Sequence, residues 1–122
     1  MPKILLVDDC LDLLEALQMI LEIHGYAVSI ALNGAIALEL VKENHFDCIL
    51  SDIQMPVMDG IEFLTKLNQM NSQVPFAFLT GHYSPESPEL KQVLGQSQFP
   101  IFEKPISAKK LVDMIAKLTE KP

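Results

Sequence analysis

Residues 48–60 read Cys-Ile-Leu-Ser-Asp-Ile-Gln-Met-Pro-Val-Met-Asp-Gly, and this stretch decides the fold class. A short apolar run ends in a single carboxylate, Asp52, and a loop containing proline and glycine follows it. This pattern is typical of a buried central strand in a parallel sheet. Open α/β sheets carry their functional groups at the carboxyl ends of the strands. The stretch therefore predicts a functional aspartate at that edge of a parallel sheet.

The rest of the chain alternates apolar runs with segments whose apolar residues recur at helical spacing. The pattern predicts strands at Ile4–Val7, Tyr26–Ile30, Cys48–Leu50, Phe76–Leu79 and Pro100–Glu103. Between and after them it predicts four helices with inward faces within Leu13–Leu21, Ile36–Val41, Ile61–Leu67 and Leu111–Leu118, and a short one within His82–Gln98. Right-handed crossovers place helices on both faces of such a sheet. We therefore expect a doubly wound α/β fold with a five-stranded parallel sheet.

Local signals mark where three of the helices begin. Asn33-Gly34 opens the second helix, whose inward face is predicted to carry Ile36, Ala37, Leu40 and Val41. Asp59 and Glu62 have the spacing of a capping box, and Ser107 precedes the last helix.

Length and composition limit the class of protein. With 122 residues and 49% hydrophobic residues, the chain is expected to form one domain over 1–122, without an effector domain. The formal charge is −7 and all nine basic residues are lysines, so we expect no direct binding of nucleic acid. Cys10 and Cys48 lack metal-ligand spacing, and no apolar stretch is long enough to span a membrane. We expect a reduced cytoplasmic protein.

The predicted strand ends bring several polar side chains to one edge of the sheet. Asp8 and Asp9 follow the first strand, Asp52 the third, Thr80 the fourth and Lys104 the fifth. Three carboxylates and one ammonium group leave a charge of −2, and like charges about 4 Å apart repel by roughly 4 kcal/mol. A divalent cation would cancel this charge. Oxygen ligands alone favour Mg²⁺, with Mn²⁺ as an alternative.

A carboxylate, a cation, a lysine and a hydroxyl group together suit phosphoryl transfer onto Asp52. Each residue also has an ordinary interpretation when taken alone. Asp8 or Asp9 would cap a helix, Asp52 would open an Asx turn, Thr80 would end a strand and Lys104 would lie on the surface. Their joint occurrence at strand ends favours the functional interpretation.

These residues resemble those of the response regulator receiver domain, the phosphoacceptor module of two-component signalling. The resemblance covers essentially the whole chain. It rests on the segments Leu5–Asp9, Asp52–Gly60, Leu79-Thr80 and Glu103-Lys104-Pro105. It implies a flavodoxin-like sheet with strand order 2-1-3-4-5, and phosphorylation of Asp52 by a histidine kinase or a histidine phosphotransfer protein.

The resemblance also assigns roles to individual residues. It implies Mg²⁺ held by Asp9, Asp52 and the backbone carbonyl of Gln54, with Asp8 acting through water. Lys104 would contact the phosphoryl group, and the bond before Pro105 would be cis. Thr80 would switch a face built from the fourth helix, fifth strand and fifth helix toward a downstream protein, as a monomer or a phosphorylation-dependent dimer. In the family, the positions of Gln54 and His82 tune the lifetime of the phosphoryl group; the alternative interpretation of His82 is an ordinary exposed loop residue.

One departure from the family affects this switch: Ile101 stands three places before Lys104, where an aromatic residue is usual. Other interpretations also stay open. The chain is expected to be no enzyme beyond self-assisted phosphoryl transfer and autodephosphorylation. The alternatives are a small Mg²⁺-dependent phosphatase with Asp52 as nucleophile, and a receiver fragment of a larger regulator. The phosphatase would need a second acid two residues after Asp52, where Gln54 stands.

Overall fold

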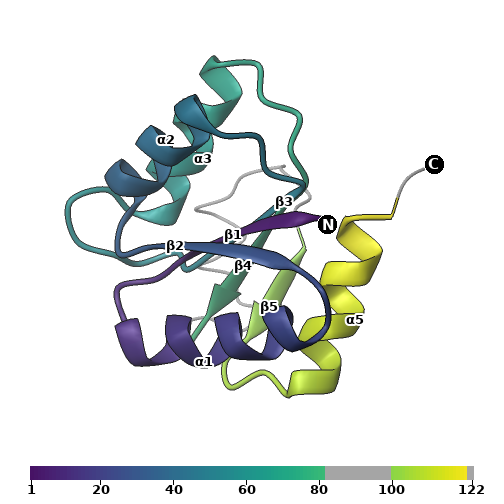
Figure 1. Ribbon diagram of the computed structural model, residues 1–122. Coiled ribbons are helices and arrows are strands. Elements are labelled where there is room, and N and C mark those ends of the chain that lie inside the picture. The colour runs from purple at the N-terminus through teal and green to yellow at the C-terminus, as the bar shows by residue number, and fades with distance from the viewer. Residues whose placement is uncertain (82–99, 121–122) are drawn as a thin grey trace.

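The computed structural model describes residues 1–81 and 100–120 of the chain (Figure 1). The helix predicted within His82–Gln98, and the proposed tuning residue His82, lie outside the described residues.

Five parallel strands form one sheet. They are β1 (Lys3–Val7), β2 (Ala27–Ala31), β3 (Cys48–Ser51), β4 (Phe76–Thr80) and β5 (Ile101–Glu103). Their spatial order is β2-β1-β3-β4-β5, which confirms the predicted topology. The register pairs Val7 with Ser51 and Thr80 with Glu103, so the strands end close to one another along the same edge. We call this edge the carboxyl rim.

Four described helices cover the two faces of the sheet. Figure 1 shows α2 (Gly34–Glu43) and α3 (Gly60–Gln69) on one face, and α1 (Leu11–Ile23) and α5 (Ala108–Leu118) on the other. The three-layer arrangement predicted from the sequence is therefore confirmed.

Successive residues of the central strands supply two separate cores, because side chains of a strand alternate between its faces. Leu5, Ile49 and Phe78 pack with α2 and α3, whereas Leu6, Leu50 and Leu79 pack with α1 and α5. Each of these side chains is at most 2% exposed, and burial of such a group contributes about 2 kcal/mol. The central strands read as nearly continuous apolar runs because both faces are buried. The edge strand β2 is covered less completely.

The predicted helix starts are present, with one correction to an inward face. The side chains of Asn33, Asp59 and Ser107 each accept a hydrogen bond from the backbone N–H three residues later. The prediction that Ile36 lies on the buried face of α2 is wrong, since this side chain is 44% exposed. Gly34 and Ala37, three residues apart, occupy the buried stripe instead, and Ile36 lies to the side of it.

Candidate functional site

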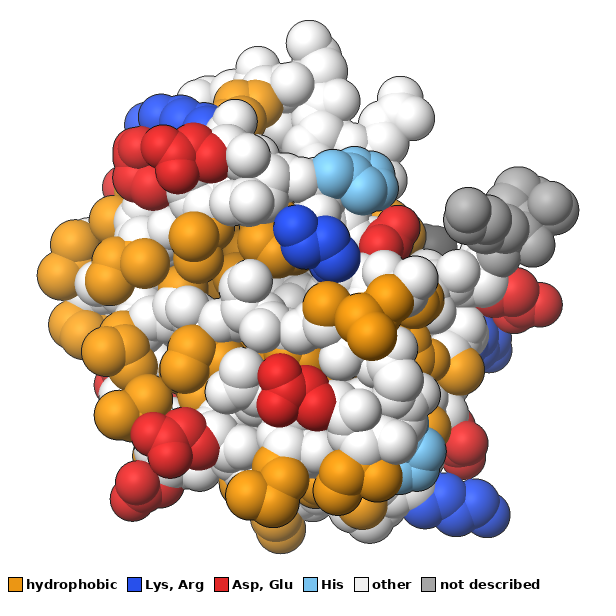
Figure 2. All heavy atoms as spheres, viewed as in Figure 1, with side chains coloured by type: hydrophobic (Ala, Val, Ile, Leu, Met, Phe, Trp, Pro, Cys, Tyr) orange, Lys and Arg blue, Asp and Glu red, His pale blue; other side chains and the backbone are white. Residues whose placement is uncertain are grey.

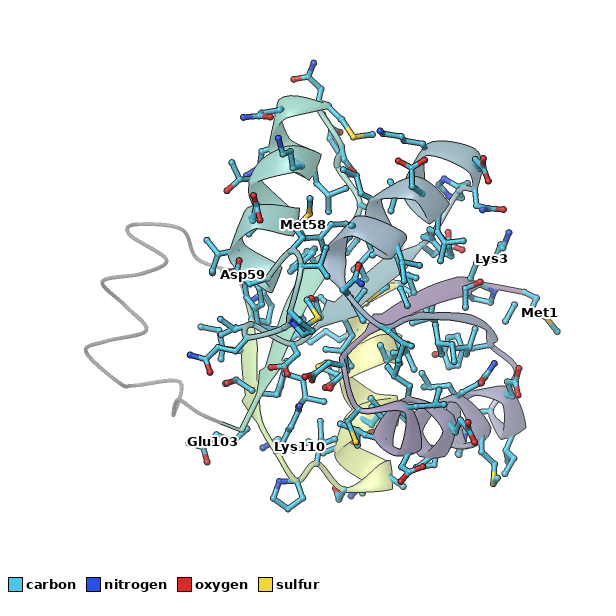
Figure 3. All side chains as sticks on the ribbon, turned by 90° about the vertical axis from the view of Figure 1, so that its left-hand side faces the viewer. Met1, Lys3, Met58, Asp59, Glu103 and Lys110 are labelled. Carbon is cyan, nitrogen blue, oxygen red and sulfur yellow. The ribbon has the colours of Figure 1, made fainter. Side chains whose placement is uncertain are left out.

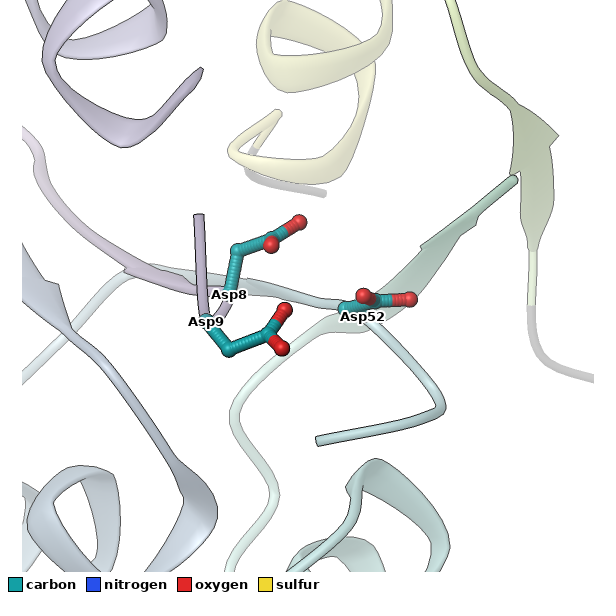
Figure 4. Close-up of side chains that lie close together, drawn as sticks. All are labelled: Asp8, Asp9 and Asp52. Carbon is teal, nitrogen blue, oxygen red and sulfur yellow. The ribbon is translucent and has the colours of Figure 1, made fainter. Parts of the chain in front are cut away.

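Three aspartates meet at the carboxyl rim. Carboxylate oxygens of Asp8, Asp9 and Asp52 all lie within 4.8 Å of one another (Figure 4). We call these residues the acidic cluster. Asp8 and Asp52 are buried, with 3% and 4% exposure, whereas Asp9 is exposed. The fold brings them together because β1 and β3 are neighbours in the sheet, and the backbone N–H of Asp52 donates to the carbonyl of Val7.

Lys104 reaches the acidic cluster from the far side of the rim. Its Nζ lies 2.6 Å from Oδ2 of Asp8 and 3.2 Å from Oδ2 of Asp52. The backbone N–H of Lys104 donates to the carbonyl of Thr80, which continues the pairing of β4 with β5 by one residue. The peptide bond between Lys104 and Pro105 is cis.

The two buried carboxylates are also held by backbone groups. Oδ1 of Asp8 accepts a hydrogen bond from the N–H of Cys10, and Oδ1 of Asp52 accepts one from the N–H of Ile53. Cys10, not an aspartate, is the N-cap of α1, and its side chain makes no capping bond. Helix capping therefore does not account for Asp8.

Burial and charge act in opposite directions on the ionisation of these groups. Burial raises the pKa of Asp52 above its usual range, and Asp8 adds to this, although Lys104 and the Ile53 amide oppose it. For Lys104, burial alone would lower the pKa, but its contacts with Asp8 and Asp52 outweigh burial and raise it. The lysine thus keeps its charge, while the carboxylate of Asp52 is less stable than that of an exposed aspartate. A cation bound beside Asp52 would restore that stability.

The donor set fits a hard divalent cation. Within the described part of the chain, the group of side chains close enough to share a metal contains carboxylates alone. Carboxylate oxygens suit Mg²⁺ or Mn²⁺, whereas a zinc site would call for imidazole or thiolate ligands.

The remaining predicted site residues lie on neighbouring segments. Thr80 is fully buried at the carboxyl end of β4. Gln54 lies in the loop between β3 and α3, residues 52–59, with its side chain exposed. Figure 3 views the molecule from the rim side and labels Met58 and Asp59 of this loop.

The sequence interpretation missed two glycines that hold the β3–α3 loop. The N–H of Gly60 donates to the carbonyl of Ile53, and a Cβ at Gly60 would overlap the carbonyl oxygen of Asp52. The N–H of Gly34 donates to the carbonyl of Met58. Both glycines follow the N-cap of a helix, in Asn33-Gly34 and Asp59-Gly60, and this shared pattern was the available signal.

Among the described helices, none is long and apolar enough to cross a membrane. Exposed apolar side chains also occur on the segments that follow the strand ends: Leu11 after β1, Leu32 and Ile36 after β2, and Val57 after β3. Figure 2 shows hydrophobic side chains gathered along the left of the molecule, where the carboxyl ends of the strands lie in Figure 1.

Comparison with curated proteins finds relatives that are longer than this chain. The transcriptional regulatory protein PrrA of Mycobacterium tuberculosis is 41% identical over 83 residues, which are 68% of this chain and 36% of PrrA. The match therefore covers about a third of the length of that relative.

Solved structures of similar length share the fold. The chemotaxis protein CheY4 of Vibrio cholerae superposes with a TM-score of 0.84 at 30% identity, covering 97% of this chain and 98% of CheY4. The response regulator TrrA of Thermotoga maritima, solved in complex with Mg²⁺ and BeF, gives a TM-score of 0.81 at 25% identity, covering 97% of this chain and 99% of TrrA.

A family model also matches most of the chain. The model of the response regulator receiver domain matches residues 4–116, a span that contains the whole acidic cluster and Lys104. The chain therefore belongs to the response regulator receiver domain family of two-component systems.

Proposed function

We propose that the chain accepts a phosphoryl group on Asp52 from a phosphorylated histidine of a kinase or phosphotransfer protein. One observation carries the proposal: a buried carboxylate at a strand end has Lys104 Nζ 3.2 Å away and two further aspartates within 4.8 Å. Family membership supports the donor class, because receiver domains belong to two-component systems.

In the proposed step, a carboxylate oxygen of Asp52 attacks the phosphorus in line with the leaving group. A P–O bond to Asp52 forms and the P–N bond to the donor imidazole breaks. The bonding electron pair stays on the imidazole nitrogen, which solvent protonates. Lys104 would turn toward the arriving phosphoryl oxygens, and the Thr80 hydroxyl would donate to one of them.

Asp9, Asp52 and the backbone carbonyl of Gln54 would hold Mg²⁺, and Asp8 would contact it through water. When bound, this ion neutralises charge on the phosphoryl oxygens in the transition state. The Mg²⁺–BeF complex of TrrA supports this choice of cation. Before transfer, three carboxylates, Lys104 and the cation sum to zero charge. An acyl phosphate near −2 in place of one carboxylate leaves about −1, which explains the need for a donor such as Thr80.

The exposed apolar residues that follow the strand ends suit a protein as phosphodonor. Leu11, Leu32, Ile36 and Val57 are exposed on the segments that follow the carboxyl ends of β1, β2 and β3. A protein partner could bury these side chains, whereas a small phosphate ester is too small to do so. Transient protein interfaces commonly combine an apolar patch with a polar site of this kind.

The output is proposed to be a protein contact made by the phosphorylated domain, alone or as a module of a longer regulator such as PrrA. Ile101, in place of the usual aromatic residue, is half-buried on β5 and packs against the core beneath α2 and α3. A switch in this chain is therefore proposed to work without an aromatic rotation at that position.

The test is intact-mass measurement after incubation with acetyl phosphate, with and without Mg²⁺. We expect one added phosphoryl group in the presence of Mg²⁺, and none in Asp52→Asn. Asp12→Asn, a matched change at an exposed carboxylate of α1, should behave as wild type. Absence of modification with any donor, together with no binding of beryllofluoride, would refute the proposal. Continuous turnover of a phosphate ester would favour the phosphatase instead.

A further inference from the structure

Two glycines donate backbone hydrogen bonds to the β3–α3 loop, one near its start and one near its end. Near the start, the carbonyl of Ile53 accepts a hydrogen bond from the Gly60 N–H across 2.7 Å. Near the end, the carbonyl of Met58 accepts one from the Gly34 N–H across 3.0 Å. Gly34 begins α2, and the rest of α2 together with β3 lies between it and this loop in the sequence, so the contact joins two distant segments.

Gly34 fits this contact because it has no side chain. Its N–H belongs to the first residue of α2 and has no acceptor within the helix, so the Met58 carbonyl supplies one. A Cβ at this position would lie 2.8 Å from the Met58 oxygen, 2.9 Å from Met58 Cγ and 3.0 Å from Phe63 Cβ. Ordinary van der Waals contacts of a Cβ lie at 3.4–4 Å. An added methyl group therefore forces a neighbour to move by about half an ångström.

The neighbour that moves is the loop. Phe63 is fully buried in the core beneath α2 and α3, and it is held on several sides. The Met58 carbonyl lies in a loop whose turn is already tight. The Met58 N–H donates to the carbonyl of Pro56, and Val57 between them has a φ of 71°. Such a turn has little freedom to absorb a displacement within itself, so the shift passes back toward Gln54 and Asp52.

We propose that Gly34 is a positioning residue for the phosphoacceptor site. Its hydrogen bond to the Met58 carbonyl fixes the position of the β3–α3 loop. The loop in turn sets the positions of the Gln54 carbonyl and the Asp52 carboxylate. The inference rests on the proposed function, since it names the fit of Mg²⁺ and the phosphoryl group as the property that Gly34 controls.

Helix propensity predicts the opposite effect of a substitution. Alanine in a helix is more favourable than glycine, so Gly34→Ala would strengthen α2 if the loop contact did not matter. A loss of site function in this variant is therefore not explained by a weaker helix.

The experiment compares wild type, Gly34→Ala and the control Glu39→Gln, which alters an exposed side chain later in the same helix. Mg²⁺ affinity is measured by calorimetry, stability by urea unfolding, and the backbone amides of residues 53–60 by NMR without metal. We expect Gly34→Ala to raise the Mg²⁺ dissociation constant on the order of tenfold and to shift those amide signals. Glu39→Gln should leave both unchanged.

A merely structural role would lower the urea midpoint and leave the Mg²⁺ affinity of the folded protein as in wild type, and that result would overturn the inference. A second measurement needs no variant: the Gly34 amide signal of wild type should move when Mg²⁺ and beryllofluoride are added. An unmoved Gly34 signal, with phosphorylation of Asp52 intact, refutes the inference but keeps the proposed function. Failure of wild type to bind Mg²⁺ or accept phosphate refutes the proposed function itself.

Discussion

Lys104 Nζ lies closer to Oδ2 of Asp8, at 2.6 Å, than to Oδ2 of Asp52, at 3.2 Å. The residues paired at the shorter distance are 96 positions apart in the sequence, and their contact ties the end of β5 to the end of β1. In this arrangement the lysine neutralises Asp8 most directly. Transfer of its hydrogen bond to a phosphoryl group on Asp52 would release Asp8, so the proposed reaction changes contacts on both sides of the site.

Removal of this lysine should destabilise the fold. Lys104→Met leaves two buried carboxylates without their common counter-ion, and we expect a loss of about 3 kcal/mol in the free energy of unfolding at pH 7. Lys109→Met, at an exposed position early in α5, should stay within about 0.5 kcal/mol of wild type. Urea unfolding of the three proteins measures the difference. Equal stability of Lys104→Met and Lys109→Met would contradict the importance of the buried contact.

Neutralisation of Asp52 should have the opposite effect, and the effect should depend on pH. Burial raises the pKa of Asp52 in the folded protein above its ordinary value of 3.8. The folded state therefore holds the proton more tightly than the unfolded chain, and ionisation lowers stability as the pH rises through this window. We expect Asp52→Asn to be more stable than wild type by about 1 kcal/mol at pH 7. The gain should shrink as the pH falls toward 3.8, which unfolding curves across this range would measure. A gain independent of pH would argue against an ionisation effect.

Mg²⁺ should stabilise the wild-type protein through the acidic cluster. A ligand at ten times its dissociation constant adds about 1.4 kcal/mol to the free energy of unfolding if it binds only the folded state. Asp9→Asn should abolish this increment yet change the metal-free stability little, because Asp9 is exposed. Asp12→Asn, at another exposed carboxylate, should keep the full increment. Thermal unfolding with and without Mg²⁺ distinguishes them, and an increment retained in Asp9→Asn would place the cation elsewhere.

The two cysteines should differ in reactivity. Burial, with a smaller contribution from Asp47, raises the pKa of Cys48 to about 12, so its thiol stays protonated and inaccessible. Cys10 is exposed. Iodoacetamide should therefore modify one thiol of the native protein and both in urea, as read by mass spectrometry after digestion. Equal labelling of Cys48 in the native protein would contradict the buried position of β3.

The sequence predicted the acidic cluster because its causes are local. An apolar run that ends in an aspartate places the carboxylate at a strand end, and parallel strands end on one rim. Asp8 and Asp52 follow this rule, and the structure brings their carboxylates together. Two strand limits differ from the prediction by one residue: β4 extends to Thr80, and β2 begins at Ala27.

The features that escaped prediction depend on contacts between distant segments. Nothing near Lys104 in the sequence indicates that its nearest partner is Asp8 and not Asp52. The roles of Gly34 and Gly60 likewise follow from the close approach of the β3–α3 loop to α2 and to the Asp52 carbonyl. Ile36 was misplaced because an apolar residue beside a helical stripe has the same spacing pattern as one within it.

Relief of backbone strain in the β3–α3 loop offers a last test. Val57 is 82% exposed and has a φ of 71°, a region that a β-branched residue adopts only at a cost of about 1–2 kcal/mol. Val57→Gly removes this cost but also gives the unfolded chain more freedom, which offsets up to about 1 kcal/mol of the gain. We expect a net increase in stability of about 0.5 kcal/mol. Asn71, after α3 with a φ of 58°, provides the matched control, because asparagine tolerates positive φ and Asn71→Gly should gain less. If urea unfolding shows Val57→Gly to be less stable than wild type, the valine side chain contributes contacts that outweigh its strained backbone.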